Sequence, residues 1–131
     1  MGDLVLLTRS YLPVEEDDYE RCSTVGARIG PSAMRKALQE AYRHKSAILH
    51  VHTHGGKGRP EFSSVDLNSA RDFVPSFFNA LPQVPHGVVV LSNDSARGLI
   101  WTDPLARPQY VDSFQQVGAP SIKFGGIHEQ A

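Results

Sequence analysis

The chain has 131 residues, of which 13 are basic and 14 acidic, so its formal net charge is -1 at pH 7. A chain of this length fits one domain, and its charge favours neither nucleic acid nor an anionic membrane as a partner. Cys22 is the single cysteine, which excludes an internal disulfide and a zinc site built from thiolates. Because no apolar run spans a bilayer and the opening residues lack a secretory signal, we expect an intracellular, cytoplasmic protein.

The N-terminal part of the sequence predicts extended segments separated by an acidic stretch. Leu4–Leu7 and Tyr11–Val14 are typical of a short extended segment, and Val25–Ile29 of a strand. Between them, five acids fall within the six residues Glu15–Glu20. A charge run of this kind is usually a solvated loop.

The clearest predicted helix covers residues 30–45, "GPSAMRKALQEAYRHK". Gly30, Pro31 and Ser32 supply a start signal, and basic residues close the segment, where they complement the helix dipole. The apolar face repeats at i, i+3 and i+4, and its members are Met34, Ala37, Leu38, Ala41 and Tyr42.

A strand and a second helix follow. Ala47–Thr53 predicts a strand that stops before a glycine pair, and Ser63-Ser64 is a plausible N-cap for the next helix. Pro75 should kink or restart that helix. Its first turns carry Asp66, Leu67, Ala70 and Phe73.

The remaining sequence predicts two more strands and an irregular tail. "HGVVVLSND", residues 86–94, indicates a buried strand that meets a turn, and "ARGLIWTDP", residues 96–104, returns as its hairpin partner. The tail, residues 104–131, is rich in Gly and Pro, with one possible strand at Ser121–Phe124. The order of elements predicts one mixed α/β (α+β) domain over residues 1–131, a curved sheet flanked by two helices.

Histidines stand at alternate positions of the strand before the second helix, at 50, 52 and 54. Side chains two apart on a strand share a face and lie about 7 Å apart, so His52 and His54 can both turn onto one ion. Burying imidazoles without partners is unfavourable, which favours a metal site over a structural role. Asp66 is the candidate third ligand, since a helix N-terminus suits a carboxylate.

Two histidines and one carboxylate leave one position of a tetrahedral zinc ion open for water. That arrangement is typical of catalytic rather than structural zinc, because the ion lowers the pKa of water and creates a hydroxide nucleophile. His50 leaves an alternative open: as a fourth ligand it would close the site, and otherwise it belongs to the core or supports the ligands.

The segment "HTH" followed by "FSSVD" resembles the signature of the JAMM (MPN-plus) metallopeptidases, H-x-H, a short spacer, then S-x-x-D. "LPVEEDDYE", the helix before "ILHVHTH", and "PHGVVVLSNDSARGLIW" are similar to bacterial JAMM proteins encoded beside E1-like, ThiF-type enzymes and ubiquitin-like proteins. The resemblance covers residues 4–103. Gly55 stands where the family commonly has proline, and the spacer is one residue longer than usual, which a Gly-rich loop can absorb.

The resemblance implies an MPN/cytidine-deaminase-like fold with zinc on His52, His54 and Asp66. Ser63 would hydrogen-bond the oxyanion formed during attack on a carbonyl. Because the motif counts back three residues from Asp66 to Ser63, we expect Ser64 to be a helix cap and not a catalyst. The implied reaction is hydrolysis after the C-terminal glycine of a ubiquitin-like or sulfur-carrier protein, with E1-like or E2-like enzymes as further partners. The family position of His50 is generally apolar or aromatic, which makes a ligand role for it less favoured.

The resemblance also implies a general-base glutamate upstream of "LVLLTRSYLPV", yet no glutamate precedes Glu15. We therefore expect a domain that is short at its N-terminus, lacking the family's first helix and strand. Loss of a general base slows hydrolysis by roughly 10² to 10⁴. Four alternatives would each explain the missing glutamate. The domain is clipped, another chain supplies a glutamate, Glu15 or Glu16 folds back, or the chain is a catalytically impaired scaffold that binds a ubiquitin-like or E1/E2-like partner. An uncovered N-terminal sheet edge would favour homo- or hetero-oligomers.

Overall fold

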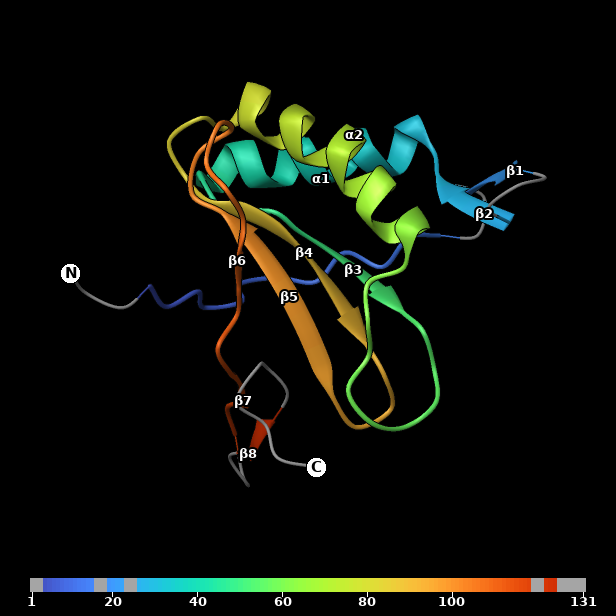
Figure 1. Cartoon of the computed structure of the whole chain (residues 1–131). Helices are drawn as coiled ribbons and strands as arrows, with labels where there is room; N and C mark the ends of the chain where they lie inside the picture. Colours follow the sequence, from blue (N-terminus) through green and yellow to red (C-terminus); the bar gives the residue numbers. More distant parts are fainter. Residues whose placement is uncertain (1–3, 16–18, 23–25, 119–121, 125–131) are drawn as a thin grey trace. The chain divides into compact units, whose positions relative to one another are not determined.

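The computed structural model describes residues 4–15, 19–22, 26–118 and 122–124. These form two compact units, Met1–Ala37 and Leu38–Ala131. The described residues contain two helices, a four-stranded mixed sheet and two separate strand pairs, which is a small α+β fold (Figure 1). None of the described helices is long and apolar enough to cross a membrane.

The first unit contains the antiparallel pair β1 (Tyr19–Cys22) and β2 (Gly26–Ile29). β2 confirms the predicted second strand from Gly26 onward, while Val25 lies outside the described residues. Residues 4–15 form neither helix nor strand, so the extended segment predicted there is not part of a sheet. Of the acidic run predicted to be a loop, Glu15 lies outside helix and strand and Glu20 lies in β1, while residues 16–18 lie outside the described residues.

Helix α1 (Pro31–His44) confirms the predicted helix. The residue after its end, Lys45, has a φ of 53°, the left-handed conformation common just past helix ends. The N–H of Ser46 donates to the carbonyl of Ala41 at 2.9 Å. Ala41 is buried. Tyr42 is 68% exposed, so the periodicity was wrong to place it on the face that packs in the core. Ala41 is the one fully buried residue of α1, while Met34, Ala37 and Leu38 of the predicted face are half-buried.

The main sheet has the order β3 (Leu49–Thr53), β4 (His86–Leu91), β5 (Ala96–Trp101) and β6 (Gln109–Tyr110). β3 pairs parallel with β4, and β4 and β5 form the predicted antiparallel hairpin. β6 was not predicted, because two exposed residues carry too little pattern to indicate a strand.

A second short pair, β7 (Phe114–Gln116) and β8 (Ile122–Phe124), forms within the tail that the sequence predicted to be irregular. β8 confirms the predicted strand from Ile122 onward, and Ser121 lies outside the described residues. β7 was missed, because "FQQ" lacks the alternation of a half-buried strand.

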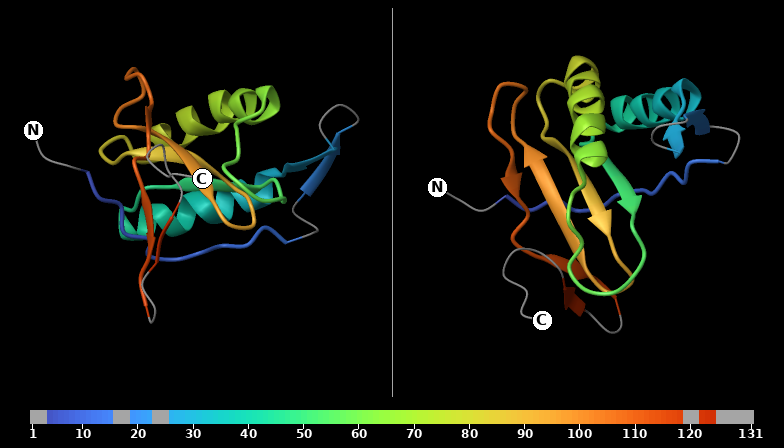
Figure 2. Two further views of the ribbon diagram at one scale, coloured as in Figure 1. Left: turned by 60° about the horizontal axis from the view of Figure 1, so that its bottom comes forward. Right: turned by 45° about the vertical axis from the view of Figure 1, so that its right-hand side comes forward.

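Helix α2 (Ser64–Ala80) joins the parallel strands β3 and β4, as a crossover connection must. It lies along one face of the sheet and packs on β4 (Figure 2). Of the two outcomes predicted for Pro75, a kink or a restart, the restart does not occur, because one helix runs from Ser64 to Ala80 through Pro75. Pro75 and Arg71 are exposed, so water can satisfy the carbonyl that proline leaves without a donor, and packing of the buried face maintains the helix.

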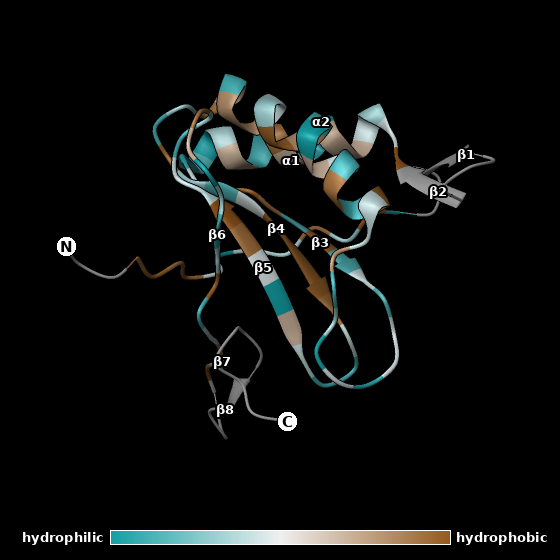
Figure 3. Cartoon of the chain, viewed as in Figure 1, coloured by the Kyte–Doolittle hydropathy of each residue, from teal (hydrophilic) through white to brown (hydrophobic). Residues whose placement is uncertain are grey.

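The core lies between α2 and the strands β4 and β5, which carry the most apolar residues (Figure 3). Phe77 and Phe78 are 2% and 3% exposed, which confirms their predicted place in the core. β-branched residues fill β4, as suits a central strand. The buried apolar residues among those described are Ala41, Ile48, Ala70, Val74, Phe77, Phe78, Leu81, Val88, Val89, Val90, Ala96, Leu99 and Ile100.

His86, the first residue of β4, is fully buried and hydrogen-bonded at both ring nitrogens. The Ile48 N–H donates to its Nδ1 at 3.0 Å, and its Nε2 lies 2.8 Å from the Leu81 carbonyl. A carbonyl only accepts, so Nε2 carries the proton and the ring is neutral. Burial lowers the pKa of His86, although the bond to Leu81 acts in the opposite direction.

Candidate metal centre

The carboxyl end of β3 and the first turn of α2 lie at the same end of the crossover unit. His52 belongs to β3, and His54 follows the strand directly. The His54 N–H bonds to the Leu91 carbonyl at 2.8 Å, which continues the pairing with β4 past the assigned end of β3. Both histidines therefore sit on backbone that the neighbouring strand holds in place.

The side chains of His52, His54 and Asp66 converge. His52 Nδ1 lies 2.8 Å from Asp66 Oδ1, and His54 Nε2 lies 2.9 Å from Asp66 Oδ2. The two imidazole rings are 4.9 Å apart at an interplanar angle of 86°. Each of the three residues offers one potential ligand atom, and these three atoms all lie within 4.8 Å of one another. The three predicted ligands are thus brought together.

The carboxylate lies at the base of this group and the imidazoles at its rim. The Asp66 side chain is 6% exposed, against 28% for His54 and 51% for His52. Burial alone would raise the pKa of Asp66, but hydrogen bonds from the backbone and side chain of Ser63 and from His52, with the charge of His54, lower it below its usual value. The carboxylate is therefore ionised at neutral pH and available as an anionic ligand.

These atoms fit a zinc ion. Donor atoms about 2.0–2.1 Å from a tetrahedral zinc ion lie about 3.3 Å from one another. The histidine–carboxylate contacts of 2.8 and 2.9 Å need to open by less than an ångström, and the whole group spans no more than 4.8 Å. Rotation of exposed imidazoles supplies such a movement. Their exposure also leaves one side of the group accessible to a fourth ligand.

Ser63 is the N-cap of α2. The Asp66 N–H donates to Ser63 Oγ at 3.0 Å, and the Ser63 N–H donates to Asp66 Oδ2 at 2.8 Å, which forms a capping box. Ser64 is the first helical residue, so the prediction that it is the cap was wrong. The S-x-x-D spacing therefore has a structural purpose of its own, since it fixes the carboxylate that faces the histidines.

We expect Ser63→Ala to lower the free energy of unfolding of the metal-free protein by about 1 kcal/mol, because the Asp66 N–H loses its acceptor. Urea denaturation measures the change. The matched control is Ser64→Ala, which removes a neighbouring hydroxyl and leaves the cap intact. An equal loss of stability in both variants would contradict the assignment of the cap.

His50 lies on the same strand but outside the ligand group. Its ring packs edge-on against Phe73 at 5.0 Å between centroids. Burial, and then the charge of His52, lower the pKa of His50 to about 4, although Asp66 acts in the opposite direction. His50 packs on Phe73 and is not a member of the ligand group found among the described residues, which agrees with a core role for it.

The ligand group found among the described residues contains a single carboxylate, Asp66. Glu61, the acid nearest to it in the preceding loop, pairs with Arg97 at 3.2 Å. Glu15 belongs to the first unit and is exposed, and Glu16 lies outside the described residues. The ligand group of the described residues therefore offers no second carboxylate that could serve as a general base.

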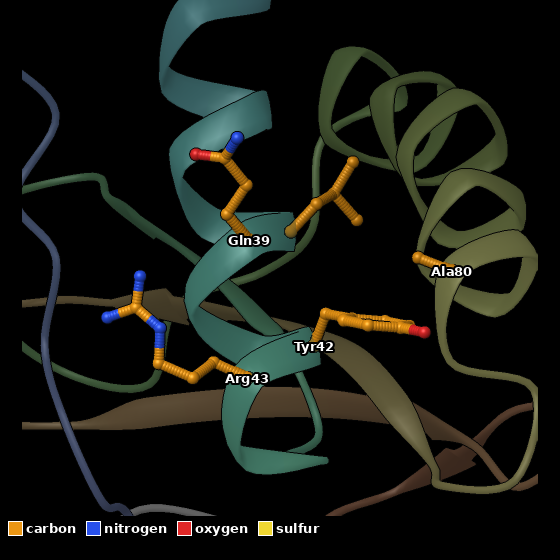
Figure 4. A pocket seen from close by; sticks show the side chains of 5 residues that line it. Gln39, Tyr42, Arg43 and Ala80 are labelled. Atoms are coloured by element: carbon orange, nitrogen blue, oxygen red, sulfur yellow. The ribbon is translucent and has the colours of Figure 1, made fainter.

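A separate hollow lies between the C-terminal half of α1 and the end of α2, where Tyr42 extends toward α2 (Figure 4). Among the described residues it brings together no set of metal-ligating side chains. Its lining consists of Leu38, Gln39, Tyr42, Arg43 and Ala80.

Sequence reasoning missed the residues that hold the loop of residues 55–62 in place. These are Ser92 and Asp94 in the turn between β4 and β5, and Arg97 in β5. Serine and aspartate are common in any turn, so no signal separated them from ordinary turn residues. Comparison with protein-family models, curated proteins and solved structures gave no match.

Proposed function

We propose that this chain is a zinc-dependent hydrolase of the JAMM (MPN-plus) type, with the MPN-like fold that the motif implies. The observation that carries the proposal is the convergence of His52, His54 and Asp66 from two different elements. The sequence motif required these three side chains to meet, although 14 positions separate His52 from Asp66. Their exposure on one side suits a catalytic rather than a closed structural site.

Each residue has a distinct task in this proposal. The two imidazoles and the carboxylate would hold zinc, which supplies a Lewis acid that activates water and polarises a carbonyl. Zinc binding requires the proton that lies between His52 Nδ1 and Asp66 to leave. The negative charge of the carboxylate then favours a cation in its place. The Ser63 hydroxyl accepts from the Asp66 N–H and keeps its own hydrogen, which can be donated to a substrate oxyanion.

The proposed substrate is a peptide or isopeptide bond after the C-terminal glycine of a ubiquitin-like or sulfur-carrier protein, with E1-like or E2-like enzymes as further partners. The loop of residues 55–60 follows His54 directly, and its residues 55–59, which include Lys57 and Arg59, are exposed and suit docking of an extended tail. Binding of such a tail as an added strand would depend on backbone hydrogen bonds more than on sequence.

A second candidate is a scaffold that binds the same partners with impaired catalysis. It is favoured by one observation, namely that the only carboxylate in the ligand group of the described residues is Asp66, which the metal would occupy. A glutamate supplied by another chain would restore the enzyme in this case.

The test combines metal analysis with a cleavage assay. We expect the purified protein to bind one zinc ion per chain and to hydrolyse a fusion joined after the terminal glycine of a ubiquitin-like protein, with chelation abolishing the reaction. Zinc binding without cleavage, together with binding of the ubiquitin-like protein, would favour the scaffold. A chain that binds no zinc would contradict the zinc-dependent hydrolase.

A further inference from the structure

The loop of residues 55–62 connects the second histidine ligand to the cap of α2, so its conformation sets how the histidines and the carboxylate face each other. The loop has an unusual backbone. Three of its glycines take φ angles that residues with side chains rarely adopt, namely Gly55 (71°), Gly56 (72°) and Gly58 (87°). Glycines lose much conformational freedom on ordering, so a loop of this composition needs partners to remain in one conformation.

The turn between β4 and β5 supplies those partners at the middle of the loop. The Gly58 N–H donates to Asp94 Oδ1 at 2.7 Å, and the Ser92 hydroxyl donates to the Gly58 carbonyl at 2.6 Å. The Asn93 N–H donates to the Gly56 carbonyl at 2.7 Å. One residue, Gly58, is therefore bound by the turn at both its N–H and its carbonyl.

The turn is itself internally fixed. Ser92 Oγ accepts from the Asp94 N–H at 3.4 Å and from the Ser95 N–H at 3.0 Å. The Ser92 N–H also donates to the Ser95 carbonyl at 3.0 Å. The Asp94 carboxylate is thus presented to the loop from a defined position.

A third attachment fixes the end of the loop. Arg97 Nε donates to the Pro60 carbonyl at 2.8 Å, and its Nη2 lies 3.2 Å from Glu61. The Arg97 side chain is only 12% exposed and stacks over the Tyr110 ring at 5.4 Å. A side chain held on several sides in this way loses little further entropy when it binds the loop.

We infer that the β4–β5 hairpin is a clamp that positions the metal ligands, with Ser92, Asp94 and Arg97 as positioning residues. The inference rests on the proposed metal site. The 55–62 loop and the turn between β4 and β5 lie side by side at one end of the sheet (Figure 1). By holding the backbone of the 55–62 loop, the clamp keeps the histidine end and the carboxylate end together before any cation arrives, and groups that orient ligands change metal affinity by about 10- to 100-fold.

Trypsin tests the clamp without any metal. The Lys57–Gly58 bond is a cleavage site whose N–H is bound to Asp94, while the following Arg59–Pro60 bond resists trypsin because of the proline. In the metal-free full-length protein, we expect Asp94→Ala to speed cleavage after Lys57 by roughly 10-fold, since cleavage requires local opening of the loop. Asp94→Asn keeps an acceptor oxygen and should retain most of the protection.

The control is Asp103→Ala, which removes an equivalent bond at 2.8 Å from a carboxylate to the N–H of Leu105 in another loop. It should leave cleavage after Lys57 unchanged. Equal cleavage rates in Asp94→Ala, Asp103→Ala and the wild type would refute the clamp.

Zinc titration then separates positioning from loop order alone. We expect Asp94→Ala to weaken zinc binding roughly 10-fold and Asp94→Asn to restore it, with the Co²⁺ absorption spectrum of the Ala variant broadened by mixed ligand geometry. Faster cleavage with unchanged zinc affinity would refute the positioning role. A wild type that binds no zinc would refute the proposed function, and the positioning role with it, while the proteolysis result would still show whether the loop is clamped.

Discussion

Asp66→Asn is expected to weaken zinc binding by at least about 100-fold while the protein remains folded. The substitution replaces an anionic ligand, ionised because its pKa is lowered, with a neutral amide of the same shape. The amide oxygen can still accept the Ser63 N–H, so the capping box is largely kept and the metal-free stability should fall by about 1 kcal/mol at most. Competition with a chromophoric chelator measures the affinity, and thermal denaturation of the metal-free proteins measures the fold.

The matched control for this substitution is Asp103→Asn, which alters an exposed carboxylate that accepts a backbone N–H outside the ligand group. It should bind zinc as the wild type does. Zinc affinity that survives in Asp66→Asn would place the cation elsewhere and remove the basis of the metal site. A large loss of metal-free stability would instead mean that the charge of Asp66 serves mainly its pairing with the histidines.

The positions of the candidate ligands were predictable because two simple local rules determine them. Alternation along a strand put His52 and His54 on one face, and the N-terminus of a helix was the natural place for Asp66. Both predictions are local, and each depends only on an element whose existence the sequence indicated clearly. That these local positions meet follows from the parallel pairing of β3 with β4, which brings the end of the strand next to the start of α2.

The supporting residues could not be predicted, because their roles depend on contacts between segments distant in sequence. Asp94 binds Gly58, 36 positions away, and Arg97 binds Pro60, 37 positions away. Nothing in a turn sequence indicates which other loop it will face. The short strands β6 and β7 were missed for a similar reason, since their assignment depends on a partner strand and not on their own pattern.

His86 is the clearest residue of this kind, since a histidine at the start of a strand gives no sign of being fully buried. We expect His86→Leu to lower the free energy of unfolding by roughly 2–5 kcal/mol at pH 7.5, because the Ile48 N–H and the Leu81 carbonyl both lose their partner inside the core. Urea denaturation measures the change. His44→Leu is the control, because the His44 side chain is 31% exposed and pairs with Glu40 at 3.2 Å on the surface of α1, so its loss should cost less than about 1 kcal/mol.

The pH dependence of the same variant tests the neutral state of the ring. Because the pKa of His86 is lowered in the folded protein, the unfolded chain binds a proton below pH 6.5 that the folded chain does not. The wild type should therefore lose stability as the pH falls below 6.5, by up to about 1.4 kcal/mol per pH unit from this group, until the folded pKa is reached. His86→Leu lacks this contribution, so its deficit relative to the wild type should shrink toward pH 5. A deficit that stays constant or grows on acidification would mean that His86 is charged in the core, and NMR of the ring nitrogens would then show protons on both instead of on Nε2 alone.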